Sequence, residues 1–343
     1  MNALAYGIIG VGHLGAIHAK VAKQMTSLDL VGVYDTDVSR GRMVAEQVGV
    51  PCFETMEELL DQVDAVSIVV PTVHHFEVAQ KALEHGCHIF LEKPITATVD
   101  EARRIVHLAK QAGKKLQVGH IERFNPAVLA LKEYSFEPMF IESHRLSPFN
   151  PRGTDVSVIL DLMIHDLDII LALVDRPLAS IDASGVAVVS DTEDIANVRL
   201  TFDNGAVANI TTSRISVKAM RKMRIFQKNM YISIDFLQKQ SEIFQLSTGE
   251  VSGGKGLPVA TIGEGDRAKQ VLYERPEVPE VNSMELELDK FAQAINKGEH
   301  TPVTGEDGLR ALDVAATILQ KIRHPEDVQQ GGRCPNHRAQ EAD

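Results

Sequence analysis

The first 120 residues alternate short apolar runs with longer amphipathic segments. The runs "AYGIIG", "LVGVYD" and "AVSIVVP" have the length and composition of buried strands. The segments after the first and third runs, "LGAIHAKVAKQM" and "HHFEVAQKALEHG", repeat apolar residues at helical spacing. Strands separated by helices of this length predict a parallel sheet with right-handed crossovers. We therefore expect residues 1–122 to form a doubly wound α/β domain of the Rossmann type.

This regular alternation of strands and helices ends near residue 122. A nearly continuous apolar segment, at about residues 156–174, predicts one long buried helix. It is followed by runs of alternating polarity such as "ANVRLTFDNGAVANITTSR", in which "DNG" predicts a hairpin turn. We expect residues 123–325 to form an α+β domain with a large, mostly antiparallel open sheet.

The last third of the chain contains a polar segment, two helical segments and a tail. A polar, glycine-bearing stretch at about residues 249–268 predicts a mobile loop. The segments "SMELELDKFAQAINKG" and "GEDGLRALDVAATILQKI" predict two helices, the second at about residues 305–322. The polar residues 326–343 predict a disordered tail.

Composition narrows the classes of function. The formal net charge of −12 argues against nucleic acid or an anionic membrane as a partner. No apolar run is long enough to span a membrane, and the N-terminus lacks a signal-type pattern, so we expect a cytoplasmic protein. Cys52, Cys87 and Cys334 follow no metal-binding or disulfide spacing. They indicate a reducing compartment and provide no zinc site.

The first apolar run ends in "GVGHLG", which gives Gly10, Gly12 and Gly15 the spacing G-x-G-x-x-G. In a dinucleotide site one glycine permits the tight turn, one lets the pyrophosphate approach the backbone, and one lets helix and strand pack closely. The motif lies between a predicted strand and a predicted helix, as that function requires. We therefore predict a dinucleotide site here, which also includes His13 and Leu14.

Asp35 ends the second apolar run, 25 residues after Gly10. A carboxylate at this position accepts hydrogen bonds from both ribose hydroxyls and repels a 2′-phosphate, which favours NAD over NADP. Arg40 is close enough in sequence to weaken that preference.

Polar residues also follow two later strands. Pro71 and Thr72 come just after "AVSIVV", while Glu92, Lys93 and Pro94 end "HIFLEKP". A charged pair at the end of an apolar strand is costly unless something there uses it. The carboxyl ends of parallel strands border the ligand crevice of such sheets, so we expect these residues to contact ligand.

The stretch from "PTVHH" to "EKP" resembles the Gfo/Idh/MocA oxidoreductase family, whose hallmark is E-K-P after a P-T/N-x-x-H stretch. The resemblance covers essentially the whole chain and includes "VTGEDGLRALDVA", similar to the family's C-terminal helix that returns to the nucleotide domain. It implies that Lys93 contacts substrate and the nicotinamide region, that Glu92 orients Lys93, and that His75 lies near the cofactor. It also implies a cis peptide before Pro94. The residues expected to bind NAD are thus Gly10, Gly12, His13, Leu14, Gly15, Asp35, Pro71, Thr72, His75, Glu92 and Lys93.

The predicted buried helix "DVSVILDLMIHDLDIILALV" contains polar residues at helical spacing. Asp161, His165 and Asp168 share one face, and a histidine one turn from a carboxylate in so apolar a helix indicates a site. The family places a D-x-x-x-H pair against the substrate. The resemblance therefore implies that His165 is the acid/base and that Asp161 orients it or holds a sugar hydroxyl. Histidine suits this task because its ordinary pKa lies near working pH. Asp166 and Asp168 are expected to have structural roles behind the site.

The reaction expected from these residues is oxidation of a secondary alcohol. The alcohol loses its proton to His165, Lys93 polarises the oxygen, and NAD accepts the hydride. No metal-binding cluster is evident in the sequence, so zinc-assisted oxidation is not expected.

The stretch "GHIERFNPAV", together with the D-x-x-x-H helix, resembles the UDP-N-acetylglucosamine 3-dehydrogenase branch of the family. This implies oxidation of the sugar 3-hydroxyl to a ketone, which a partner aminotransferase converts to an amine for 2,3-diamino-sugar lipid A. Arginine recognises the pyrophosphate of a UDP-sugar well. The candidates are Arg123, Arg145 and Arg152, with Asn125 beside the first. Any of these arginines is alternatively a surface charge, and Arg123 alternatively pairs with an acidic neighbour at the domain joint.

Three alternatives to that function remain open, two with another substrate and one without catalysis. A UDP-N-acetylglucosaminuronate dehydrogenase would use the same chemistry with another cation for the carboxylate. An inositol-type polyol dehydrogenase would not need the arginines. A non-catalytic regulator that senses NAD would be expected to lose Lys93 or His165, and the sequence has both. The resemblance also implies self-association through the open sheet face, as a homodimer or homotetramer.

Overall fold

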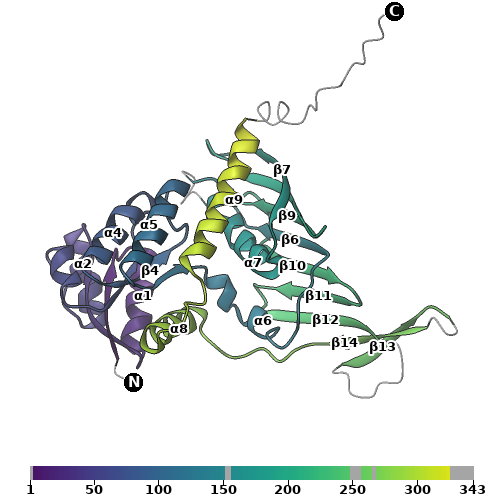
Figure 1. Cartoon of the computed structure of the whole chain (residues 1–343), viewed down its shortest axis with the longest axis horizontal. Helices are drawn as coiled ribbons and strands as arrows, with labels where there is room; N and C mark the ends of the chain where they lie inside the picture. The colour runs from purple at the N-terminus through teal and green to yellow at the C-terminus, as the bar shows by residue number, and fades with distance from the viewer. Residues whose placement is uncertain (1–2, 151–155, 248–255, 265–267, 325–343) are drawn as a thin grey trace, which may run out of the picture.

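The computed structural model describes residues 3–150, 156–247, 256–264 and 268–324. Two sheets form the framework, one in each half of the molecule, and helix α9 runs between them (Figure 1). No helix in the described ranges is long and apolar enough to cross a membrane.

The first sheet has five parallel strands in the order β2-β1-β3-β4-β5. Its strands are β1 (Leu4–Ile9), β2 (Leu28–Tyr34), β3 (Ala65–Ile68), β4 (His88–Glu92) and β5 (Leu116–Gly119). The connecting helices are α1 (His13–Gln24), α2 (Val38–Val48), α3 (Met56–Leu60), η1 (Thr72–His74), α4 (His75–Glu84) and α5 (Val99–Gln111). The strands β3 and β5 are buried throughout, since helices cover both faces of a parallel sheet. The predicted Rossmann fold is confirmed.

Local sequence signals set several helix starts in this half. Thr98 begins α5 with a capping box, in which Thr98 Oγ1 accepts from the backbone of Glu101 and the Glu101 side chain accepts from the backbone of Thr98. Thr55 and Glu58 form the same arrangement at α3. Such caps satisfy amide donors that have no partner within the helix, and they fix where each crossover begins.

The second sheet has nine strands in the order β13-β14-β12-β11-β10-β6-β9-β8-β7. Its strands are β6 (Phe140–Leu146), β7 (Leu178–Val186), β8 (Ile195–Phe202), β9 (Val207–Ser213), β10 (Met220–Gln227), β11 (Met230–Asp235), β12 (Gln240–Ser247), β13 (Leu257–Ile262) and β14 (Lys269–Glu274). Among these described strands, β6 and β9 pair in parallel and the other neighbours pair antiparallel. This confirms the predicted second sheet.

One face of this second sheet is covered by helices and the other is open (Figure 1). The remaining described helices are η2 (Ile121–Phe124), α6 (Pro126–Leu129), the π-helical turn η3 (Ile159–Met163), α7 (Ile164–Val174), α8 (Ser283–Lys297) and α9 (Gly305–Arg323). The helix α9 contributes Leu312 to the core of the first half and Val314, Ala315 and Ile318 to that of the second. It therefore joins the two cores.

Packing crosses the division expected at residue 122. Helix α8 buries Met284, Leu288 and Phe291 in the core of the first half, although it lies late in the chain. The C-terminal helix α9 also packs against the first half, through Leu312. Amphipathic spacing gives the buried face of a helix but not the sheet that this face will cover.

Two predicted elements differ in the structure. The helix expected at 156–174 begins at Ile159, and its first turn is π-helical. The loop expected at 249–268 includes a strand, β13, which pairs with β14. Every residue of β13 is exposed, so the strand carries no alternation of buried and exposed positions that a sequence pattern would reveal. Residues 249–255 and 265–267 of that predicted loop lie outside the described residues, as does the predicted tail.

Candidate active site

The glycine loop has the geometry of a phosphate cradle. Gly10 has φ +85°, and a Cβ there would lie 2.9 Å from the carbonyl oxygen of Val69. A Cβ at Gly15 would lie 1.9 Å from the carbonyl oxygen of Gly10, so only glycine lets α1 approach the strand. A Cβ at Gly12 would meet little, its nearest neighbour being the Arg40 guanidinium at 3.9 Å. No side chain caps α1 at Gly12, so its first amides are free to bind an anion.

Asp35, which is 8% exposed, lies beside this loop. One carboxylate oxygen accepts from the Val11 amide at 2.8 Å, and the other accepts from the Asp37 amide at 2.8 Å. Nε of Arg40 lies 3.8 Å from Asp35, while its NH2 group donates to Asp37 at 2.8 Å. The carboxylate therefore fixes the glycine loop to the end of β2, with a cation nearby.

A cavity of about 710 Å³ extends from the glycine loop to the end of β4. Most of the residues predicted to bind NAD border it: Gly10, Gly12, Leu14, Asp35, Pro71, Thr72, His75, Glu92 and Lys93. Gly15 is buried behind the cavity and His13 is exposed on α1, and neither borders it. The open glycine backbone, the uncapped helix and the carboxylate fit the pyrophosphate and ribose of a dinucleotide.

His75 is buried where the two strand ends meet. Its ring nitrogens lie 2.9 Å from the carbonyl oxygens of Pro94 and Val70. Burial lowers the pKa of His75, although both carbonyls oppose the shift. The ring thus joins the loop after β3 to the loop after β4, where the peptide between Lys93 and Pro94 is cis as the family resemblance implied.

Glu92 ends β4 and is nearly buried. Burial raises the pKa of this carboxyl, but the hydrogen bond with His18 and the charge of Lys93 outweigh that effect and lower it. The His18 Nε2 atom lies 3.1 Å from Glu92, and its Nδ1 atom lies 3.1 Å from the hydroxyl of Ser67. The sequence interpretation missed His18, although a histidine on the apolar face of α1, three residues after the glycine motif, was a visible signal.

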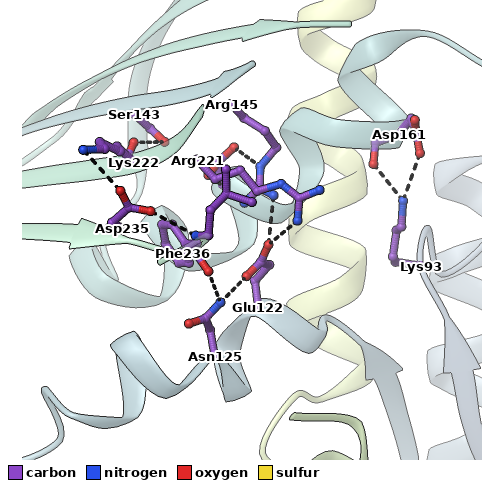
Figure 2. A network of polar contacts seen from close by, with 12 residues as sticks. Lys93, Glu122, Asn125, Ser143, Arg145, Asp161, Arg221, Lys222, Asp235 and Phe236 are labelled. Carbon is purple, nitrogen blue, oxygen red and sulfur yellow. Dashed lines mark hydrogen bonds and ion pairs between the residues drawn. The ribbon is translucent and has the colours of Figure 1, made fainter. Parts of the chain in front are cut away.

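Lys93 is held by a different carboxylate from the one expected. Glu92 accepts from the backbone amide of Lys93 at 3.2 Å rather than from its ammonium. The ammonium donates to the backbone oxygen of Asp161 at 2.7 Å and to its carboxylate at 3.3 Å (Figure 2). Asp161 comes from the half of the molecule that contains the second sheet, so this contact brings the two halves of the molecule together at the site.

His165 lies one turn beyond Asp161, at the start of α7. Its Nδ1 atom is buried without a hydrogen-bond partner among the described residues, and no hydrogen bond joins it to Asp161. The expectation that Asp161 orients His165 is therefore not met in this arrangement. Burial is the main reason why the pKa of His165 lies well below its usual value, and the charges of Lys93 and Arg145 lower it further. The imidazole is consequently neutral at pH 7 and able to accept a proton.

A second histidine contacts His165 and was not predicted. His120 follows β5 and is 1% exposed, with both ring nitrogens unpartnered in the described structure. Its ring lies edge-on to that of His165, with centroids 6.4 Å apart. The strand-end argument used for Lys93 also applies to β5 and would have identified His120.

The carboxylates that follow His165 point into the protein. Asp166 accepts from Arg145 Nε at 2.7 Å and NH2 at 3.1 Å. Asp168 accepts from Arg123 Nε at 2.7 Å and NH2 at 2.6 Å. Both pairs are bidentate, which fixes the rotation of α7 about its axis. These contacts agree with the structural roles expected for Asp166 and Asp168.

The arginines expected to bind substrate are instead engaged within the protein. Arg145 is 2% exposed and donates also to Glu122 at 2.9 Å (Figure 2). Arg123 lies 3.5 Å from Asp307 in addition to its pair with Asp168. The structure thus favours the structural alternative, because no exposed guanidinium remains on Arg145 and carboxylates flank Arg123. Arg152 lies outside the described residues.

Asn125, the fourth candidate for substrate binding, caps a helix. Its amide nitrogen donates to Glu122 at 3.0 Å and to the carbonyl of Phe236 at 3.2 Å (Figure 2). Its side-chain oxygen accepts from the Ala127 amide at 3.1 Å, at the start of α6. All these contacts are internal, so the geometry assigns Asn125 to the joint between the two halves and not to a ligand.

The described residues contain no group of three or more His, Cys, Asp or Glu side chains placed to hold a metal ion. The candidate site comprises the dinucleotide cavity, Lys93, Asp161 and the two histidines. This arrangement can bind an alcohol between a cation and a neutral base, next to a hydride acceptor.

Known proteins share this architecture. The chain matches the oxidoreductase family with an NAD-binding Rossmann fold over residues 4–120 and the Gfo/Idh/MocA C-terminal domain over residues 137–232. It is 38% identical to the UDP-N-acetylglucosamine 3-dehydrogenase of Acidithiobacillus ferrooxidans, over 92% of this chain and 95% of that protein. A solved structure of that enzyme superimposes with a TM-score of 0.84 at 35% identity, covering 94% of this chain and 98% of that one. The myo-inositol 2-dehydrogenase of Thermotoga maritima is 28% identical, over 94% of this chain and 97% of that protein. The chain therefore belongs to the Gfo/Idh/MocA family of NAD-binding oxidoreductases.

Proposed function

We propose that this dehydrogenase oxidises the 3-hydroxyl of UDP-N-acetylglucosamine to the 3-keto sugar nucleotide, with NAD as the hydride acceptor. The observation that carries the proposal is the meeting of Lys93 and the helix of His165 beside the dinucleotide cavity. The similarity to the 3-dehydrogenase of Acidithiobacillus ferrooxidans over nearly the whole chain supports the choice of substrate.

His165 takes the proton of the hydroxyl. Its Nδ1 atom is buried, which leaves Nε2 as the accepting atom. A neutral imidazole is required for this step, and the low pKa that burial gives His165 provides it at pH 7. The charge of Lys93 nearby favours the neutral form further.

Lys93 positions and polarises the oxygen that loses the proton. An ammonium has three hydrogens, and among the described residues those of Lys93 face two acceptors, both on Asp161. One hydrogen is therefore available to the substrate oxygen, where a fixed positive charge stabilises negative charge as it develops. Bound NAD supplies the hydride acceptor.

The second candidate is a polyol dehydrogenase of the inositol type. The ion pairs of Arg123 and Arg145 favour it, because these arginines were the groups expected to bind a diphosphate. The 28% identity to a myo-inositol 2-dehydrogenase is consistent with it.

Partners of the protein are also proposed. We expect an aminotransferase to consume the ketone, which leads to 2,3-diamino-sugar lipid A. We expect the open face of the nine-stranded sheet to mediate self-association as a homodimer or homotetramer. A row of aromatic rings across that face supports this: Phe140, Phe226, Tyr231, Phe244 and Tyr273. The cytoplasmic location stays a prediction.

The direct test is NADH formation from NAD with UDP-N-acetylglucosamine, UDP-N-acetylglucosaminuronate and myo-inositol in parallel, each with a carbonyl trap. The trap removes the ketone, because alcohol oxidation by NAD is unfavourable near neutral pH. We expect signal with UDP-N-acetylglucosamine alone, and NMR of the trapped product should place the carbonyl at position 3. Signal with myo-inositol alone would replace the proposal by the polyol alternative.

A further inference from the structure

We infer that Arg221 binds the diphosphate of the substrate, in the role that sequence patterns suggested for Arg123 and Arg145. The inference rests on the proposed function, since it identifies the cation that a sugar nucleotide requires.

Arg221 on β10 is the register partner of Arg145 on β6. Side chains alternate along β10, so Arg221 lies on the same face as the buried Met223 and Ile225, toward the helices. The next arginine of the strand that points to the opposite, open face is Arg224. Arg145 and Arg221 therefore stand side by side on the inner face of the sheet.

Like charges opposite each other destabilise a sheet unless a counter-charge lies between them. Glu122 provides it, with one carboxylate oxygen 2.9 Å from Arg145 NH1 and 3.5 Å from Arg221 NH1 (Figure 2). The two arginines then differ. Arg145 is buried and also has a bidentate contact with Asp166, whereas the Arg221 side chain is 42% exposed and has only this longer contact in the described structure. Arg145 is therefore structural, whereas Arg221 is available to bind a ligand.

Arg221 lies in the electrostatic surroundings of the acid/base. Burial is the largest cause of the low pKa of His165, and Arg221 is among the charges that lower it further, together with Lys93. Figure 2 shows Arg221 on the same side of the second sheet as the pair of Lys93 and Asp161. A half-exposed guanidinium is thus placed near the reacting groups but is not held by them.

This placement suits a sugar nucleotide. The diphosphate of UDP-N-acetylglucosamine is attached at position 1, two ring carbons from the carbon that bears the 3-hydroxyl. Its recognition therefore requires a cation near the acid/base, at about the distance of one ring. A planar guanidinium binds phosphate oxygens in pairs, and it holds that geometry better than an ammonium does.

The test compares Arg221→Gln and Arg221→Lys with Arg224→Gln. Arg224 is the matched control, because it lies on the same strand but faces the other way and pairs with Glu142 at the surface. We would measure UDP binding calorimetrically with NAD present, and steady-state kinetics with UDP-N-acetylglucosamine. The Arg221→Gln change should raise the Kd for UDP and the KM about 10- to 100-fold, because a hydrogen bond to a charged group usually contributes that much to binding. The kcat should change little. Arg221→Lys should give a smaller increase and Arg224→Gln none.

Values for Arg221→Gln within about twofold of the control would overturn the inference, as would wild-type protein that does not bind UDP. Melting temperature and NAD binding establish that each variant is folded. If Arg221→Gln is unfolded, Arg221→Lys decides, since it keeps a charge beside Glu122 but loses the paired geometry. UDP binding does not depend on turnover, so the two proposals can fail separately. Wild type that binds UDP through Arg221 but leaves UDP-N-acetylglucosamine unoxidised would refute the reaction and leave the diphosphate site standing.

Discussion

The imidazole of His165 lies among positive charges and against the buried ring of His120. Burial is the main cause of its low pKa, and Lys93 is the largest of the charges that add to it. His120 is also buried, which lowers its own pKa below the usual histidine value. The proposed base, His165, is therefore a neutral imidazole beside a second neutral imidazole and one lysine.

The pH dependence of oxidation follows from this environment. The neutral form of His165 is active, and its pKa is lowered, so kcat/KM should hold as the pH falls and should decline only well below about 6.5, the usual histidine value. His165→Asn should abolish turnover and retain NAD binding. The measurement is kcat/KM from about pH 5 to 8, the range in which histidine ordinarily titrates. Exposed His107 provides the control variant, His107→Asn, which should match the wild type. An inflection at or above the usual value would mean that His165 is not the titrating base.

At the scale of elements, α7 is fixed by two arginines from other parts of the chain. Arg145 comes from β6 and Arg123 from η2, and each contacts one carboxylate of α7 through two hydrogen bonds. The π-helical turn η3 precedes α7, and such turns often occur at functional sites. The ion pairs of Asp166 and Asp168 fix the face of α7 that points into the protein. The turn η3 carries Asp161, which accepts from Lys93.

Removing one of these arginines should be costly. Arg145→Met leaves Asp166 buried without its cation and leaves Glu122 with the longer contact to Arg221, so we expect the free energy of unfolding to fall by about 3–5 kcal/mol. Arg224→Met breaks only an exposed pair with Glu142 and should cost less than about 1 kcal/mol. Chemical denaturation of both variants gives the comparison. Equal losses would show that the buried network is not what fixes α7.

At the scale of the whole molecule, the second sheet has two unlike faces. Ile225, Ile232 and Ile243 belong to the core under the helices. Their strand neighbours Phe226, Tyr231 and Phe244 stack in a row on the other face. An apolar row of this kind on an open sheet favours association with another sheet.

We expect self-association to depend on that row. Tyr231→Glu places a charge at its centre and should convert the oligomer to a monomer, with the melting temperature reduced because an interface is lost. Light scattering after size-exclusion chromatography measures the mass. Lys239→Glu, in the turn between β11 and β12, is a control that should leave the mass unchanged. A monomeric wild type, or an unchanged mass in Tyr231→Glu, would refute the proposed interface.

The sequence by itself determined the features that depend on local pattern. Period-two and helical spacing predict elements directly, so the parallel sheet, the glycine loop and the antiparallel domain were predictable. The strand-end rule placed Lys93 at the crevice, because the carboxyl ends of parallel strands meet at one edge. The strand β13 was missed since it is exposed on both faces.

Only the tertiary structure decided which charges meet. Lys93 and Asp161 are 68 residues apart, and Arg123 and Asp168 are 45 apart. Their spacing along the chain contains no information on contact. The sequence patterns therefore suggested Arg123 and Arg145 as ligands of a diphosphate and Asp161 as the partner of His165. Folding instead buries Arg145 against two carboxylates, turns Asp161 toward Lys93 and leaves Arg221 exposed. Residue type sets what a side chain can do, whereas burial and neighbours brought by distant segments decide whether it remains free to do it.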